Sequence, residues 1–497
     1  MKRLTGTDAL FLSLETPSWH QHVGGLTILD PGDRPVTFED VVDAIDARIG
    51  GAPKFRWKLK EMPLGLDRPV WVDDADFDIR RHVRRVGVPA PGGFKETAEV
   101  AGMILEPQLD RSRPLWEMWF LEGLAHGRVA LLLKYHHCLL DGMAGASLAT
   151  ILMDLEPDAE GPLVAFPPPE EQSAGPEPST AEALVRVASE MAQRPFRAAR
   201  YAVRGSQKLL AGASAFRRGD RHGGLFGPDT PFNDSIGPRR ALSFSSVSLD
   251  DVKELRVHHD VKVNDVVLAL VGGALRQYLI DLDALPDESL VTGVPVSVRA
   301  EGDATHNNQI SNMFVALGTD IVDPVERLRA IHTTSQAAKA MHQAMGAREI
   351  QSLGEVASPL ILSTALRTVY ATKLMARLPA KVNTIVSNVP GPPVPLYVCG
   401  ARVTGIFPCS VILDGMGINT TVISYRDRID FGFHVDPDLV PDPWAVAERI
   451  PEALAELKAA SGLGPPTPVE DPFGEKVVPK ARPKSTAGKA KAVPSTP

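Results

Sequence analysis

The chain has 497 residues, of which 44% are hydrophobic and 23% charged, and its formal net charge is −8 at pH 7. This composition is that of a soluble globular protein with a sizeable core, and the length predicts two to four domains. The acidic balance excludes a general attraction to nucleic acid. The three cysteines, Cys138, Cys399 and Cys409, match no zinc-binding spacing and are expected to be reduced thiols.

The first residues and the apolar runs indicate how the chain relates to membranes. The segment from Met1 to Asp8 lacks the apolar centre of a signal peptide. No run of roughly 18 or more apolar residues occurs, which is the length that a membrane-spanning helix needs. We therefore expect a cytoplasmic protein whose contact with a membrane or lipid droplet, if it makes one, is peripheral.

In the N-terminal part, a buried strand leads into a helix. The run from Val129 to Tyr135 (VALLLKY) is apolar apart from one lysine, as in a strand that is buried on both faces. Apolar residues at helical spacing follow from Gly142 to Leu155. We expect residues 1–156 to form a first domain in which a short loop joins this strand to this helix.

A connection separates this domain from the rest of the chain. Seven prolines between positions 157 and 178 exclude a regular element and indicate a linker. Residues 180–216 carry six basic side chains among apolar ones and predict a helix, which would either lie on an anionic membrane surface or be a solvated connector. Residues 219–238 are rich in Gly, Asp, Asn and Pro and predict a loop. The connection is thus expected to span residues 157–238.

The following part again mixes strands and helices. A long helix is predicted from Asp265 to Leu282, and proline-containing turns open amphipathic helices at Pro324–Met345 and Trp444–Ala459. Five runs are strand candidates: Leu290–Val298, Asn312–Leu317, Thr384–Ser387, Thr420–Tyr425 and Ile429–Val435. Because strands and helices alternate in both parts, we expect an α/β fold twice over, with a second domain at 239–463. Residues 464–497 are poor in apolar side chains and predict a disordered basic tail.

Two histidines lie between the predicted buried strand and the helix that follows it. Residues 136–142 read HHCLLDG. A loop that leaves a sheet can present side chains to a ligand while the sheet fixes their positions. A neutral imidazole there can take the proton of an alcohol as the alcohol attacks a thioester. Two other interpretations of His136, His137 and Asp141 stay open at this point: they could bind a metal ion, or they could be purely structural.

This segment resembles the active-site motif of a known superfamily. His-x-x-x-Asp is the motif of the chloramphenicol acetyltransferase-like superfamily, and the doubled histidine with a trailing glycine resembles the bacterial wax ester synthase/acyl-CoA:diacylglycerol acyltransferase family. Other segments are similar to signatures of that family and occur in the expected order: residues 4–26 (LTGTDALFLSLETPSWHQHVGGL), Pro114-Leu115-Trp116, Asn264-Asp265, Val294–Arg299 and Val386–Pro392.

The resemblance implies a fold and a mechanism. The fold would be α/β, with two chloramphenicol acetyltransferase-like domains, each a mixed sheet with helices, and a tunnel at their interface. His137 would be the general base in a ternary complex without a covalent acyl-enzyme. His136 would support the loop or the acceptor pocket, and Asp141 would be structural. Cys138 would be a small buried residue and not a nucleophile, and no cofactor is implied because acyl-CoA is a substrate.

Further residues are assigned by their match to family motifs. Asn264 is a candidate oxyanion donor or, as the residue before a long helix, an N-cap. Arg299 is a candidate partner for the Asp141 carboxylate, because a guanidinium can form two parallel hydrogen bonds with a carboxylate. Residues 430–433 (DFGF) resemble a structural motif of plant relatives. Substrate-contacting or packing roles are expected for Pro114, Trp116, Gly142, Ser387 and Asn388.

The expected function is transfer of a long-chain acyl group from acyl-CoA to diacylglycerol, to a long-chain alcohol or to both, which yields triacylglycerol or wax ester. The competing hypotheses are a metal-dependent hydrolase that uses the two histidines with Asp141, and a non-catalytic protein of lipid surfaces. The expected partners are the two substrates and a membrane or droplet surface, with no nucleic acid.

Overall fold

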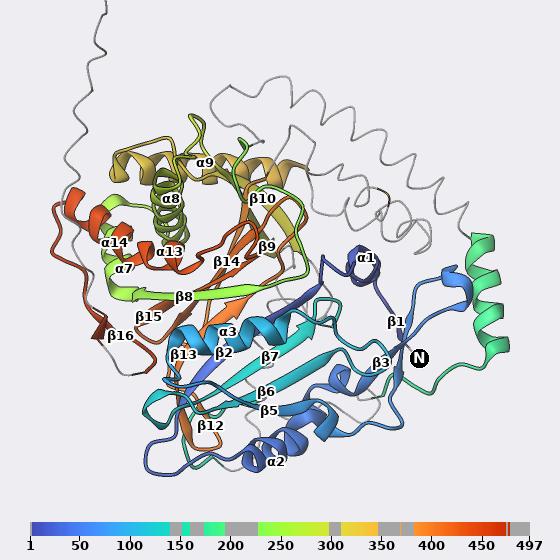
Figure 1. Ribbon diagram of the computed structural model, residues 1–497. Helices are drawn as coiled ribbons and strands as arrows, with labels where there is room; N and C mark the ends of the chain where they lie inside the picture. Colours follow the sequence, from blue (N-terminus) through green and yellow to red (C-terminus); the bar gives the residue numbers. More distant parts are fainter. Residues whose placement is uncertain are drawn as a thin grey trace, which may run out of the picture.

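The computed structural model describes residues 2–139, 152–159, 173–193, 227–297, 310–345, 368, 382–473 and 476–477 (Figure 1). Two six-stranded sheets with helices packed on them make up most of it. The mixed α/β fold with two layered units is therefore confirmed. Asp141, Gly142 and Arg299 lie outside the described residues, as does the predicted helix 142–155 up to residue 151.

The first sheet is built mainly from the N-terminal part of the chain. Its strands lie in the order β12, β13, β2, β7, β6, β5. In β7, Ala130 and Leu132 pack with α3, whereas Leu131 packs with α2 on the opposite face, so this strand is buried on both sides as predicted. The bounds of these elements are β2 His22–Asp30, β5 Val83–Gly87, β6 Trp116–Glu122, β7 Val129–His136, β12 Tyr397–Val398, β13 Ala401–Cys409, α2 Phe38–Arg48 and α3 Phe94–Leu105.

The second sheet has the strand order β10, β9, β11, β14, β15, β8. Its strands are β8 Ala241–Ser248, β9 Val291–Ser297, β10 Ile310–Ala316, β11 Thr384–Val389, β14 Ile418–Tyr425 and β15 Arg428–Val435. All five strand candidates of this part are thus confirmed. The helices are α7 Leu249–His259, α8 Val263–Asp281, α9 Pro324–Met345, α13 Trp444–Ala447 and α14 Arg449–Ala460. The single helix predicted from Trp444 is divided in two at Glu448.

Helix α8 is the centre of the C-terminal core. Its residues from Val266 to Leu275 are almost all inaccessible to solvent and pack with strand residues such as Val294 and Phe431. Among the described helices, α8 is the one that is long and apolar enough to cross a membrane, but 72% of its apolar window is buried inside the protein. Burial of this kind is what the core helix of a layered domain requires.

Strands β12 and β13 correct the expected domain boundary. They belong by sequence to the predicted domain 239–463, but they pair with the first sheet: β13 is antiparallel to β2, with Phe407 opposite Leu26 (Figure 1). Phe407 is fully buried between the two units and packs against Phe94 and Phe244. An alternating apolar pattern specifies a strand but not its partner. The pattern therefore could not show that β12 and β13 join the sheet of the N-terminal unit.

The DFGF segment of β15 holds β13 in place, which agrees with an architectural role. The Asp430 carboxylate accepts hydrogen bonds from the backbone N–H of Ile406 at 3.0 Å and from the Arg428 guanidinium at 2.6 Å. A Cβ atom at Gly432 would lie 1.9 Å from the backbone oxygen of Pro408 in β13. Only glycine therefore lets β15 approach β13 this closely.

The start of the predicted disordered tail is instead ordered. Phe473 is buried in the cluster that contains Phe407. The Arg128 guanidinium donates to the backbone oxygen of Pro472 at 2.9 Å, and Asp251 accepts from Thr467. Residues Val469–Glu470 (β16) pair with Lys476–Val477 (β17). The amino-acid composition did not predict this order, because only one phenylalanine and a few hydrogen bonds hold the segment. Residues after 477 lie outside the described part.

A third, small sheet contacts the predicted basic helix. The sheet joins β1 (Lys2–Arg3), β4 (Val70–Asp73) and β3 (Trp57–Lys60). The helix is described at residues 180–193, and its Ala183 and Val187 pack on this sheet. The remainder of the helix, predicted to residue 216, lies outside the described residues, together with the loop predicted at 219–238 up to residue 226.

Candidate active site

His136 is the last residue of β7 and His137 follows it directly, and the two side chains face opposite sides of the first sheet. The backbone N–H of His136 donates to Leu115 in β6 at 3.0 Å, and that of His137 donates to Gln21, just before β2, at 2.8 Å. Successive side chains of a strand alternate in direction. The strand pairing thus continues to the motif itself and fixes which ring faces which side.

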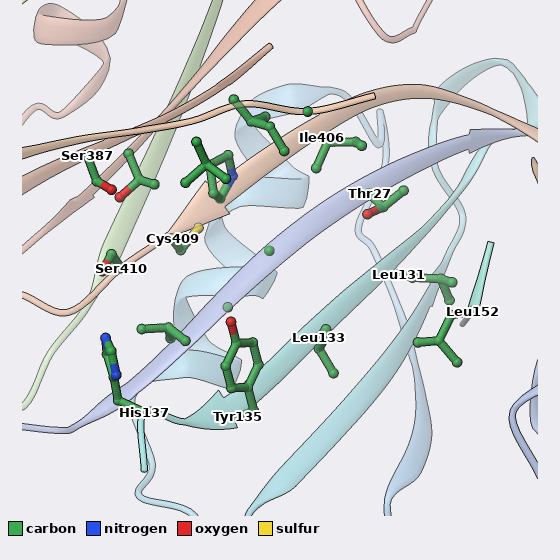
Figure 2. Close-up of a pocket in the computed structure, with 18 of the residues that line it drawn as sticks. Thr27, Leu131, Leu133, Tyr135, His137, Leu152, Ser387, Ile406, Cys409 and Ser410 are labelled. Atoms are coloured by element: carbon green, nitrogen blue, oxygen red, sulfur yellow. The ribbon is translucent and has the colours of Figure 1, made fainter. Parts of the chain in front are cut away.

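His137 faces a cavity between the two sheets. Its half-buried ring stacks on Phe11 of helix α1 (Gly6–Leu14), with the ring centroids 4.1 Å apart and the planes inclined by 17°. Phe11 thereby limits rotation of the imidazole. Figure 2 shows the ring directed into the cavity from the end of β7.

His136 is buried on the other side and takes part in a polar network. Its Nδ1 accepts a hydrogen bond from the backbone N–H of Cys138 at 3.1 Å, so the ring proton belongs on Nε2, which lies 3.7 Å from a Glu15 carboxylate oxygen. Burial and the neighbouring Arg111 hold the pKa of His136 well below its usual value. The ring is therefore neutral and fixes the backbone turn beside His137, which is what a supporting role requires.

Glu15 connects this network to two further elements. Its carboxylate accepts from the Arg111 guanidinium at 2.7 Å and from the backbone N–H of Gln21 at 3.3 Å. The Glu15 side chain is only 3% exposed, which strengthens its hydrogen bonds, although the Arg111 side chain remains partly exposed. The network joins the end of α1, the start of β2 and the histidine loop into one rigid assembly.

The cavity has a volume of about 600 Å³ and is lined by both sheets. Ser387 of β11 and Ser410 lie toward the end of the cavity where His137 is, while Leu131, Leu152 and Ile406, with the single polar side chain of Thr27 beside them, lie toward the other end (Figure 2). This polarity gradient suits a molecule with a reactive polar head and a long apolar chain. Further lining residues from the two sheets include Val23, Gly24, Leu133, Pro295, Ile385, Val398 and Ile423.

The predicted site residues of the C-terminal part are only partly brought to the cavity. Ser387 lines it. Asn388 donates to the Asn264 side chain at a long 3.4 Å, and neither is among the described residues that line the cavity. Asn264 is not the N-cap: α8 starts at Val263, and the Asp265 carboxylate caps it by accepting from the Lys262 backbone N–H at 3.0 Å.

Pro114 and Trp116 belong to the core of the first unit, outside the described lining of the cavity. The Trp116 indole N–H donates to the backbone oxygen of Phe55 at 2.8 Å, and its ring stacks on His82 with centroids 4.7 Å apart. The packing role expected for this motif therefore matches the structure better than a substrate contact. Leu115, between them, provides the carbonyl that binds the His136 backbone.

Cys138 is unsuited to act as a nucleophile. It is fully buried, and burial together with the nearby Asp8 raises the pKa of its thiol well above the usual value. A thiolate is the reactive form of cysteine, so this environment suppresses the reactivity that a covalent mechanism needs. Cys138 is thus buried, as expected from the sequence.

The geometry also bears on the metal hypothesis. Among the described residues, no group of three or more His, Cys, Asp or Glu side chains is arranged to hold a metal ion. His136 already uses Nδ1 and faces Glu15, whereas His137 faces the cavity. Two rings on opposite sides of a strand cannot bind the same ion in this arrangement.

Comparison with known proteins identifies the family. Residues 4–267 match the wax ester synthase/diacylglycerol acyltransferase catalytic domain, and residues 306–458 match the corresponding C-terminal domain. The chain belongs to the wax ester synthase/diacylglycerol acyltransferase family. A Mycobacterium tuberculosis protein named as a diacylglycerol O-acyltransferase is 39% identical over 467 residues, which are 93% of this chain and 91% of that protein. A second M. tuberculosis protein with a similar name is 36% identical, and the matched residues are 92% of this chain and 99% of that protein.

Solved structures agree with this assignment. The wax ester synthase/diacylglycerol acyltransferase from Marinobacter aquaeolei VT8 superimposes with a TM-score of 0.66 at 27% identity, covering 93% of this chain and all of that one. The first condensation domain of the calcium-dependent antibiotic synthetase gives a TM-score of 0.56 at 16% identity. The superposition covers 96% of this chain and 99% of that domain, which shows that the two share a fold. This chain is thus an acyltransferase with the two-unit fold that the family resemblance implied.

Several residues of the site were not singled out from the sequence. Four residues surround the two histidines: Phe11 of α1, Glu15 at its C-terminal end, Gln21 just before β2, and Tyr135 of β7. The first three lie in the 4–26 segment that resembles the opening of the family, so the signal was present for the segment as a whole. It could not rank individual residues, because which side chains face the cavity depends on strand pairing.

Proposed function

We propose that this acyltransferase moves a long-chain acyl group from acyl-CoA to the hydroxyl of diacylglycerol or a long-chain alcohol, with His137 as the general base. One observation carries the proposal: an imidazole held by Phe11 lies in the wall of a mainly apolar cavity between the two sheets. Names of relatives that include diacylglycerol and wax ester support the choice of acceptors.

The proposed reaction is a direct transfer in a ternary complex. Nε2 of His137 takes the hydroxyl proton of the acceptor, whose oxygen attacks the thioester carbonyl carbon. The carbonyl electron pair moves onto oxygen, and its return breaks the C–S bond. The imidazolium then gives its proton to the departing thiolate, so the products are an ester and free CoA. Acyl-CoA is a substrate, and no further cofactor enters these steps.

The cavity's apolar end supports an orientation for the acyl chain. Leu131 and Leu152 lie there, away from His137 (Figure 2). Each buried methylene contributes about 0.8 kcal/mol to binding, so a long chain gains most if it extends toward these leucines. The thioester carbon is then left at the polar end, beside His137.

The decisive experiment uses labelled palmitoyl-CoA with either dioleoylglycerol or hexadecanol. The labelled ester and the released thiol should form in equal amounts. The His137→Ala protein should form neither, while His258→Ala, which removes an exposed histidine of α7, serves as the matched control. Full product formation by His137→Ala would refute the base assignment, and absence of ester with either acceptor for the unaltered protein would refute the substrates.

We also propose peripheral contact with a lipid surface. Apolar side chains are exposed on the helix at 180–193 and on the turn between β3 and β4 of the small sheet: Leu64 is 81% exposed and Val185 71%. The insoluble acceptors would be reached from such a surface. Flotation with anionic vesicles tests the idea: binding should decrease for the Leu64→Ser/Val185→Ser double variant, and equal flotation of variant and unaltered protein would contradict it.

A further inference from the structure

The wall of the cavity next to His137 carries a phenol. Tyr135 lies on β7, two residues before His137, whose backbone N–H continues the pairing with the β2 side at Gln21, so both side chains lie on the same face of the sheet. Both line the cavity and are directed into it from neighbouring positions (Figure 2). Among the described residues that line the cavity, Tyr135 is the one tyrosine.

The Tyr135 ring is held firmly. It is opposite Val23 of β2 and Trp116 of β6, and only 8% of it is exposed. Cross-strand neighbours on both sides leave the ring little freedom. A hydroxyl group on a ring held in this way keeps its position when a charge develops beside it, and apolar surroundings strengthen the hydrogen bond that it donates.

The proposed reaction needs a hydrogen-bond donor for the oxyanion of its tetrahedral intermediate. Asn264, the candidate from the sequence, bonds to Asn388 outside the described lining. Two other polar groups of the wall, the side chains of Thr421 and Asn419, bond to each other and to the Val411 backbone oxygen, each at 2.9 Å. Asn264 is therefore not placed at the described wall to supply this donor.

The spacing of the two side chains fits this need. Residues two apart on a strand are separated by about 6.8 Å along it. A carbon placed between the two side chains can have its attacking oxygen within about 3 Å of the imidazole and its carbonyl oxygen within about 3 Å of the phenol. Base and donor would then act on opposite sides of the same carbon.

We propose that Tyr135 is a further catalytic residue, whose hydroxyl donates a hydrogen bond to the oxyanion of the tetrahedral intermediate. The inference rests on the proposed acyl transfer at His137. As the acceptor oxygen bonds to the thioester carbon and its proton passes to His137, the carbonyl electron pair becomes the oxyanion that Tyr135 binds. The hydrogen bond weakens again when the C–S bond breaks. Tyr135 keeps its own proton throughout.

The test compares two phenol deletions. Tyr135→Phe should lower the single-turnover rate of ester formation about 100-fold, which is the usual effect of losing one oxyanion donor, with KM for palmitoyl-CoA and for both acceptors changed little. Tyr278→Phe removes a buried phenol from α8 in the C-terminal core and should leave the rate unchanged. An undiminished rate for Tyr135→Phe, or a raised KM with an unchanged rate, would overturn the proposal.

A second variant keeps the ring and changes only the acidity of its hydroxyl. Replacing Tyr135 by 3-fluorotyrosine gives a stronger donor and should change the single-turnover rate, whereas an unchanged rate would overturn the proposal even if Tyr135→Phe failed to fold. The His137→Ala protein separates the two ideas. If it is inactive while Tyr135→Phe is fully active, only the role of Tyr135 fails; if the unaltered protein forms no ester, the acyl transfer itself fails.

Discussion

Acidification should destabilise the junction of the two sheets through buried histidines, of which His434 is the clearest case. His434 of β15 is fully buried, and its Nδ1 lies 2.6 Å from the backbone oxygen of Ser410 at the cavity. Burial, followed by the charge of Arg240, lowers the pKa of His434 to about 3. His20, across the junction, has its pKa lowered to about 4 by the same two causes, and burial also lowers that of His22.

The sign and size of the effect follow from proton linkage. The unfolded chain binds a proton at His434 near pH 6.5, the folded chain only near pH 3. Protons therefore favour the unfolded state between these values, and stability falls as the pH decreases through this window. From neutral pH to about pH 5, which is roughly 1.5 units below the unfolded value, His434 alone should cost about 2 kcal/mol of unfolding free energy. That is a large part of the roughly 5–15 kcal/mol typical of a protein.

Urea denaturation at neutral pH and at about pH 5 measures this cost. The unaltered protein and His434→Gln should differ by about 2 kcal/mol in how much stability they lose between the two conditions. Taking this difference cancels the contributions of titrating groups that do not interact with His434. The exposed His258, changed to Gln, is the matched control and should leave the loss unaltered. Equal losses in His434→Gln and the unaltered protein would refute the reasoning.

Three further outcomes are expected. Gly432→Ala should cost at least about 1–3 kcal/mol of stability in urea denaturation, because its Cβ would lie 1.9 Å from the Pro408 backbone oxygen. Gly87→Ala is the control and should have a small effect, since nothing lies within 4 Å of its Cβ position. Equal losses of stability in the two variants would contradict the close contact between β15 and β13. Cys138→Ala should keep most of the acyl-transfer rate, and its loss in a folded protein would revive a thiol mechanism. Dialysis against a chelator should leave ester formation intact, and a loss that zinc restores would favour a metal site.

Elements that depend on local sequence patterns could be predicted, whereas contacts between distant segments could not. Strand β7 and helix α8 were recognisable because continuous apolar runs and helical spacing are local properties of the sequence. The pairing of β13 with β2 was not, because a strand's partner is chosen by packing across long stretches of chain. Phe473 was missed for the same reason, since its contact lies far away in sequence.

The candidate site divides in the same way. His136 and His137 were found because a doubled histidine at a strand end is a recognisable motif. The partners Phe11 and Glu15 come from α1 and its C-terminal end, and Arg111 from the loop before β6, and no local pattern connects them with the histidines. Their roles became visible only when α1 and the start of β2 were seen beside the end of β7.

The sequence by itself determined the family, the strand that carries the histidines and the order of the motifs, because these are properties of short segments. Only the tertiary structure decided that His137 faces the cavity and His136 faces Glu15. It also decided that β13 pairs with β2 in the first sheet and brings Cys409 and Ile406 to the cavity. The physical reason is common to both: the direction of a side chain follows from the register of its strand, and register is set by the neighbours that the fold brings together.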